Sequence, residues 1–189
     1  MKKEIENRVI ELGGKCNFQK KSLHDDLMSI LFDKSFLFKN FWDFIPDKHW
    51  KGFESKLLER GSVSDEEVPC VHFEFEIYLY TPFKPGTADY EEEYSGYLDE
   101  CQDYTKSIIK SDISEFMVIG HMDMERYFVS LSDENPENPT VYQVDLDAPF
   151  SECTGITIEG TFEGFLNNLL SPIEYQKVIE EYIKEVHSK

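Results

Sequence analysis

The spacing of apolar residues changes near residue 70, and this change constrains the fold more than any other feature of the chain. Upstream, apolar residues recur at helical spacing, as at Ile5, Val9 and Leu12. Downstream, the stretch HFEFEIYLY at residues 72–80 alternates apolar and polar side chains, which is typical of a strand with one buried face. Helices followed by strands within 189 residues predict an α+β fold.

Helical signals fill the first sixty residues. The glycine pair at residues 13–14 provides a stop for the first helix. Ser22 is placed to cap the next helix, in a capping box completed by Asp25. The aromatic stretch SFLFKNFWDFIP at residues 35–46 predicts a further helical segment, and another is expected at residues 47–60. These elements make up the predicted N-terminal helices.

The remainder predicts a central, mostly antiparallel sheet with flanking and C-terminal helices. The acidic segment at residues 87–110 returns to helical spacing, Thr161 is placed to cap a closing helix, and Pro172 starts the last one. Further strands are predicted at residues 116–119, 127–131, 140–146 and 155–158. We expect one globular unit, in which a helical extension at residues 1–39 packs on an α+β domain at residues 40–189.

Net charge narrows the classes of partner. The chain has 38 acidic residues against 19 basic ones, which gives a formal charge of -19. Such a charge repels phosphate backbones and anionic lipid surfaces, and it steers the chain toward a basic partner. We therefore expect no binding to nucleic acid or to membranes. The sequence does not predict an oligomeric state.

Cysteine usage and the N-terminal sequence indicate the compartment. The four cysteines lie far apart without a C-x-x-C pair, which favours reduced thiols over a zinc or redox motif. The N-terminal stretch MKKEIENRVIEL carries charges where a signal peptide needs an apolar run, and no run approaches the ~18 apolar residues of a membrane span. Nucleotide-binding and nucleophile motifs are absent from the sequence. We expect a cytoplasmic protein without a cofactor.

Five stretches, taken in order, resemble one known family. They are IPDKHWKGFESKLLERGSV, EIYLYTP, FMVIG, TVYQVDLD and TFEGFLNNL, and they cover about residues 40 to 170. Their order and spacing are similar to the SUKH superfamily, the Smi/Knr-like fold. The resemblance implies a SUKH-like α+β domain and a bacterial immunity protein, one that neutralises a partner toxin, often a nuclease, by binding it. The family has no shared catalytic centre, so the resemblance implies no catalytic residue and no enzyme.

The chain departs from the family at two places. The family commonly has a Gly-Asp-rich tip after its central strand, where this chain has HMDMER at residues 121–126. A longer helix with a dense acidic face also replaces the short helix that usually follows the first strand. These departures leave the predicted fold unchanged, but they prevent a family binding surface from being transferred to this chain.

Two groups of side chains suggest a metal-dependent hydrolase as the alternative. His121, Asp123 and Glu125 alternate beyond Gly120, and His72 and Glu74 alternate along the predicted strand, so either group could offer nitrogen and oxygen ligands. We interpret the first group as a hairpin connection, because the strand is expected to end at Gly120. The two groups could meet only if their strands were neighbours in the right register.

The acidic helix is the main candidate for binding the toxin, which we expect to be basic. Complementary charge would raise the association rate, and aromatic anchors would prolong the complex. A plain solvated helix face is the alternative, as is a regulatory scaffold that binds a cellular partner. The predicted partner-binding residues are Asp89, Glu91, Glu92, Glu93, Asp99, Asp103, Tyr78, Tyr80, His121 and Asp123.

Overall fold

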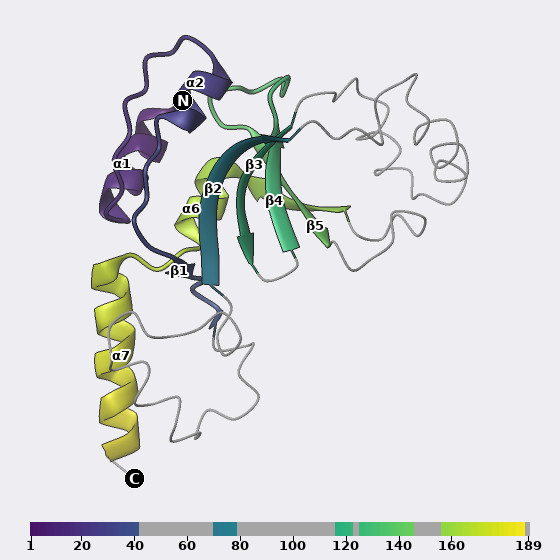
Figure 1. Ribbon diagram of the computed structural model, residues 1–189. Coiled ribbons are helices and arrows are strands. Elements are labelled where there is room, and N and C mark those ends of the chain that lie inside the picture. The colour runs from purple at the N-terminus through teal and green to yellow at the C-terminus, as the bar shows by residue number, and fades with distance from the viewer. Residues whose placement is uncertain (42–69, 79–115, 123–124, 146–155, 188–189) are drawn as a thin grey trace.

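A curled antiparallel sheet with helices on one side forms the body of the protein (Figure 1). The computed structural model describes residues 1–41, 70–78, 116–122, 125–145 and 156–187. Within these ranges, six strands pair in the order in which they occur along the chain. The strands are β1 (Phe36–Leu37), β2 (Cys70–Tyr78), β3 (Phe116–Met122), β4 (Glu125–Ser130), β5 (Thr140–Asp145) and β6 (Ile156–Thr161). The α+β prediction is thus confirmed.

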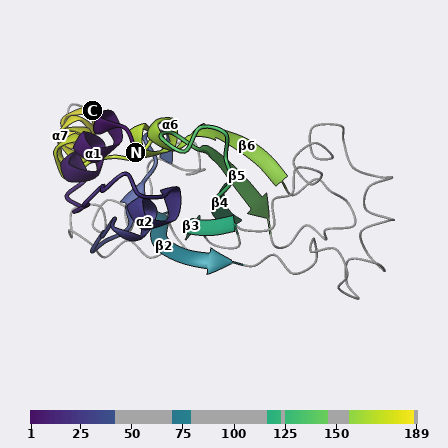
Figure 2. The ribbon, with the colours of Figure 1, turned by 90° about the horizontal axis from the view of Figure 1, so that it is seen from above.

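The helices come from the two ends of the chain. They are α1 (Lys3–Glu11), α2 (Leu23–Met28), α6 (Phe162–Asn167) and α7 (Pro172–His187). Seen from above in Figure 2, α1, α2 and α6 lie on one side of the sheet. In Figure 1, α7 extends away from this group, with the C-terminus at its far end. In the described part of the chain, no helix is long and apolar enough to cross a membrane.

The predicted caps are present. Gly13, just beyond α1, has a φ of 87°, a left-handed conformation that a glycine adopts without strain. The hydroxyl of Ser22 accepts a hydrogen bond from the Asp25 backbone N–H at 3.0 Å and begins α2. Thr161 begins α6 in the same way, accepting from the Gly164 N–H at 3.2 Å. These local signals were therefore sufficient to place three helix ends.

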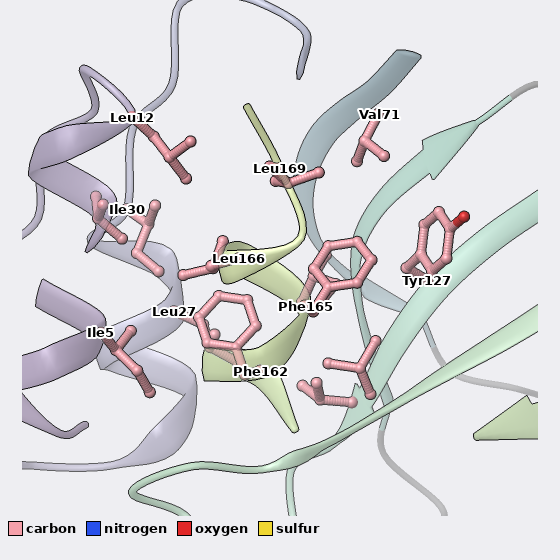
Figure 3. Close-up of a cluster of buried hydrophobic side chains, with 14 of the residues drawn as sticks. Ile5, Leu12, Leu27, Ile30, Val71, Tyr127, Phe162, Phe165, Leu166 and Leu169 are labelled. Atoms are coloured by element: carbon pink, nitrogen blue, oxygen red, sulfur yellow. The ribbon is translucent and has the colours of Figure 1, made fainter. Parts of the chain in front are cut away.

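Helix α6 forms the centre of the core (Figure 3). Its Phe162, Phe165 and Leu166 are buried and project between α1 and the strands. One cluster joins them to Ile5 of α1 and to Val129 of β4. Burying each such side chain contributes about 1.5–3 kcal/mol. Residues 1–39 therefore share a core with the sheet, while their assignment as a separate extension stays a prediction.

The start of the predicted helical segment at residues 35–46 is instead strand β1. Phe36 pairs with Val71, and Leu37 pairs with Cys70. Phe36 is buried in the main core, whereas Leu37 contributes to a second cluster with Cys70. The burial of consecutive side chains in two different clusters agrees with the alternation of a strand. The prediction of a helix over Phe36–Leu37 is therefore wrong.

Strand β3 does not end at Gly120, as the sequence suggested. It continues to Met122, and His121 pairs with His72 on one side and with Arg126 on the other. Gly120 is needed for a different reason, because a Cβ at this position would lie 2.5 Å from the backbone oxygen of His72. β3 and β4 form the predicted hairpin, but His121 and Glu125 are strand residues, so the connection is shorter than predicted.

Side chains alternate between two faces of the sheet. Tyr127, Val129 and Val141 point toward the helices and belong to the main core. On the opposite face, Phe128 of β4 stacks on Tyr142 of β5 with ring centroids 5.4 Å apart. The predicted helices at 47–60 and 87–110 lie outside the described residues, so they stay predictions.

Candidate functional site

A pocket of about 520 Å³ lies on the helix-covered side of the sheet, at the end where β3 leads into β4. Three kinds of side chain meet in it: rings and a thioether, amides, and charged groups. A volume of this size is within the usual range of ligand-binding pockets. The lining residues are Phe38, Lys39, Asn40, Met122, Glu125, Tyr127, Gln143, Glu159 and Asn168.

Strand alternation builds the floor of the pocket. Glu125 and Tyr127 share one face of β4, since they are two positions apart. Gln143 of β5 pairs directly with Tyr127. Glu159 of β6 lies at a β-bulge between Ile158 and Gly160, and its side chain also lines the pocket. The floor thus carries two carboxylates, an amide and a phenol on neighbouring strands.

The backbone after β1 forms the wall of the pocket. The Leu170 N–H donates to the Leu37 carbonyl at 2.8 Å, and the Lys39 N–H donates to the Asn168 carbonyl at 2.7 Å. These bonds hold residues 37–39 antiparallel to residues 168–170. Phe38 then packs beside Tyr127, with ring centroids 6.2 Å apart. Segments far apart in the sequence therefore fix the wall against the floor.

A network of charged side chains centred on Arg8 and Glu174 holds this wall in place. The Arg8 side chain is almost fully buried and donates to the Leu166 carbonyl at 3.2 Å and to the Leu169 carbonyl. It also donates to Glu174 at 2.9 Å, and Glu174 in turn lies 3.0 Å from the Lys39 ammonium. One carboxylate thus links α1 and α7 to the wall of the pocket.

The pKa of Glu174 reflects these contacts. Partial burial alone would raise the pKa, but hydrogen bonds from the Ser171 backbone, Arg8 and Lys39 favour the ionised form. Together they lower the pKa from 4.5 to about 2. The charge of Lys39, although it lines the pocket, is therefore balanced by an ionised carboxylate outside it.

The carboxylates of Glu125 and Glu159 both act on the Tyr127 phenol, and all three side chains line the pocket. The Tyr127 hydroxyl points away from the hydrophobic cluster in Figure 3 and donates to Glu125 Oε2 at 3.2 Å. Burial raises the pKa of Tyr127, and the nearby charges of Glu125 and Glu159 raise it further. Tyr127 is thus held as a hydrogen-bond donor that orients Glu125. The pocket thus combines carboxylates, amides and a phenol with an apolar side formed by Phe38 and Met122.

The two histidines singled out in the sequence meet on the opposite face of the sheet. His72 and His121 are cross-strand partners, and their rings stack with centroids 5.0 Å apart and planes at 18°. Glu74 lies 3.3 Å from His121, and the hydroxyl of Ser35 lies 2.6 Å from His72. The nitrogen lone pairs of an imidazole lie in the plane of its ring, so two stacked rings hold them in nearly parallel planes that do not converge on one ion. Across the described residues, no group of three potential ligands has the geometry to hold a metal ion.

The predicted partner-binding residues are mostly outside the described ranges. His121 is described, and Tyr78 is the last residue of β2. The others, Asp89, Glu91, Glu92, Glu93, Asp99, Asp103, Tyr80 and Asp123, are not, so their role stays a prediction.

Sequence reasoning missed most of the pocket. The alternation in ERYFVS places Glu125 on the face of Tyr127 and Val129, and this signal was available. No sequence signal indicated that Phe38 and Asn168 line the same pocket, because this depends on contacts between residues about 130 positions apart.

Comparison with protein-family models, with curated proteins and with solved structures finds no match to this chain.

Proposed function

We propose that this protein is a non-catalytic immunity protein that binds and neutralises a cognate toxin in the cytosol. The toxin domain is basic, as expected for a nuclease, and the acidic immunity protein covers its active site or substrate groove. The observation that carries the proposal is the pocket itself, which is lined by Glu125 and Glu159 in a chain with a net charge of -19. Acidic side chains would stand in for the phosphates of the toxin's substrate.

A SUKH-type fold is part of the same proposal. It is supported by the order of the described elements: FMVIG lies in β3, TVYQVD forms β5, and TFEGFLN spans the end of β6 and α6. The acidic segment at residues 87–103 would add charge to the binding surface, with the pocket as the part whose geometry is described.

Co-expression tests the proposal. The toxin encoded beside the gene should stop growth when it is expressed alone, and this chain should restore growth. The purified pair should form a complex that weakens as salt rises, because screening reduces the attraction between opposite charges. Growth arrest that persists in the presence of the chain would refute the proposed function.

The register of β2 and β3 favours a second candidate, a metal-dependent hydrolase. That register brings His72, His121 and Glu74 together, as a shared site would require. Binding of an ion would need the stacked rings to turn so that their lone pairs converge. Elemental analysis of the purified protein, without chelator or histidine tag, distinguishes the two functions. A stoichiometric transition metal would support the hydrolase, and its absence would exclude it.

A further inference from the structure

We propose that the outer edge of β6 binds an extended segment of the partner as an additional strand of the sheet. The segment has apolar side chains at alternate positions and basic side chains between them. This inference rests on the proposed function, in which the partner is a basic toxin, and it names the kind of segment that makes the contact. Three features carry it: the place of β6 in the sheet, the side chains beside it, and the charge of the chain.

Strand β6 lies at the edge of the sheet, as Figure 2 shows. It pairs with β5 on one side, and no other described strand lies beyond it. Its residues 158–161 are all exposed to solvent. An edge strand directs part of its backbone N–H and C=O groups away from the sheet, where another extended chain can pair with them. The edge of β6 is therefore available for the addition of a strand.

An apolar row leads to this edge on the sheet face opposite the helices. Phe128 of β4 pairs with Tyr142 of β5, which pairs with Ile158 of β6. Exposure increases along the row, from the buried Phe128 through the half-buried Tyr142 to Ile158, which is 55% exposed. The residue opposite Ile158 on an added strand would continue this row, and an apolar side chain there would bury Ile158. The row thus selects apolar side chains at alternate positions of the segment.

The charge of the chain selects the kind of partner. A second copy of β6 is the other extended segment that could pair with this edge, but each copy carries a net charge of -19. Two such chains repel each other, whereas a basic segment is attracted. The positions between the apolar side chains of the segment are the places for its basic side chains. Charge complementarity therefore favours a basic partner over a second copy.

A bulge in β6 brings this edge next to the pocket. Glu159 is the extra residue between Ile158, which pairs with Tyr142, and Gly160, which pairs with Val141. Gly160 has a φ of 108°, and Glu159 lines the pocket. Bulges bend edge strands and often lie beside functional sites. A strand added to β6 would therefore run beside the pocket, so that one partner would contact both.

A peptide titration tests the inference without the toxin. The probe is the acetylated and amidated peptide Lys-Val-Lys-Val-Lys-Val. One control has glutamate in place of lysine, and the other is the lysine peptide with every backbone nitrogen methylated, so that it cannot donate to a strand. Amide chemical shifts and amide hydrogen exchange of the full chain are recorded. We expect saturable shifts and slower exchange at residues 158–161 with the probe, and at least about tenfold weaker binding of each control.

Matched variants locate the contact. Ile158→Lys places a charge on the edge and should weaken binding of the probe by about tenfold or more. Ile173→Lys makes the same change at a 69% exposed position of α7 and should leave the affinity unchanged. Sedimentation of the chain alone should show a monomer. A dimer that Ile158→Lys dissociates would show that a second copy occupies the edge, and it would overturn the inference.

The remaining outcomes separate the inference from the proposed function. Equal binding of the probe and its methylated form to the wild-type chain would overturn the inference, even if a variant failed to fold. If the wild-type chain rescues growth but does not bind the probe at β6, the edge contact is wrong and the proposed function stands. If the probe binds at β6 but growth stays arrested, the proposed function is wrong and the edge contact stands.

Discussion

The sheet carries a polar cluster on each face, and the two clusters differ in what their side chains surround. On the helix-covered face, Glu125 and Tyr127 border an open pocket whose wall comes from another part of the chain. On the opposite face, His72 and His121 stack on each other, with Glu74 beside them. The histidines resembled a site more closely in the sequence. The difference shows that a wall and an open volume, and not residue types alone, make a pocket.

The largest effect is expected when the support behind the pocket wall is removed. Arg8→Met should lower the free energy of unfolding by about 3–5 kcal/mol, because it leaves two buried carbonyls and Glu174 without their charged donor. Chemical denaturation measures the change. Glu11→Gln is the control, since Glu11 pairs with Arg8 at the exposed end of the network, and it should change stability by less than about 1 kcal/mol. Equal effects of the two substitutions would show that the network does not support the wall.

A smaller loss of stability is expected from a substitution where β2 meets β3, beside the histidines. Gly120→Ala should destabilise the protein by about 2–3 kcal/mol, because the new Cβ would collide with the His72 carbonyl. Gly164→Ala is the matched control in α6. Its Cβ would meet only the Thr161 hydroxyl, at 3.4 Å, so we expect a change within about 1 kcal/mol. Thermal unfolding compares the two. If Gly120→Ala were as stable as the control, the close approach of the two strands would be wrong.

The smallest effect is a pH dependence confined to the pocket wall. The pKa of Glu174 is about 2 in the folded chain against an ordinary value of 4.5, so between these values the unfolded state binds more protons. Its contribution to stability is complete above about pH 4.5 and is lost as pH falls toward 2. Glu174→Gln should therefore be less stable than the wild type at pH 6, and the difference should shrink on acidification. A difference that stays constant from pH 6 to pH 3 would contradict the assignment.

Much of the described fold follows from local sequence signals. Alternation in HFEFEIYLY predicted β2, and the caps at Ser22 and Thr161 predicted the starts of α2 and α6. The prediction of a helix at Phe36–Leu37 was wrong, because a short run of neighbouring aromatic residues favours a helix and a strand almost equally. Tertiary pairing with Val71 and Cys70 decided the outcome. The predicted strand end at Gly120 was wrong for a related reason. A glycine inside a strand cannot be distinguished from a strand end until the neighbouring strand is known.

The pocket was harder to predict from the sequence than the fold. Its floor depends on the register between strands, which places Gln143 beside Tyr127. A shift of one residue would turn these side chains to the other face. Its wall depends on contacts between residues 37–39 and 168–170, for which the sequence offers no local signal.

The affinity of the purified chain for the toxin domain tests the central claim most directly. It should be measured for the wild type, for Glu125→Gln with Glu159→Gln, and for the control pair Glu4→Gln with Glu134→Gln, at low and at high salt. The account predicts a tight, salt-sensitive complex that the pocket variant weakens by about tenfold or more and the control leaves unchanged. Equal affinities of the wild type and the pocket variant, or no complex with the wild-type chain, would contradict it.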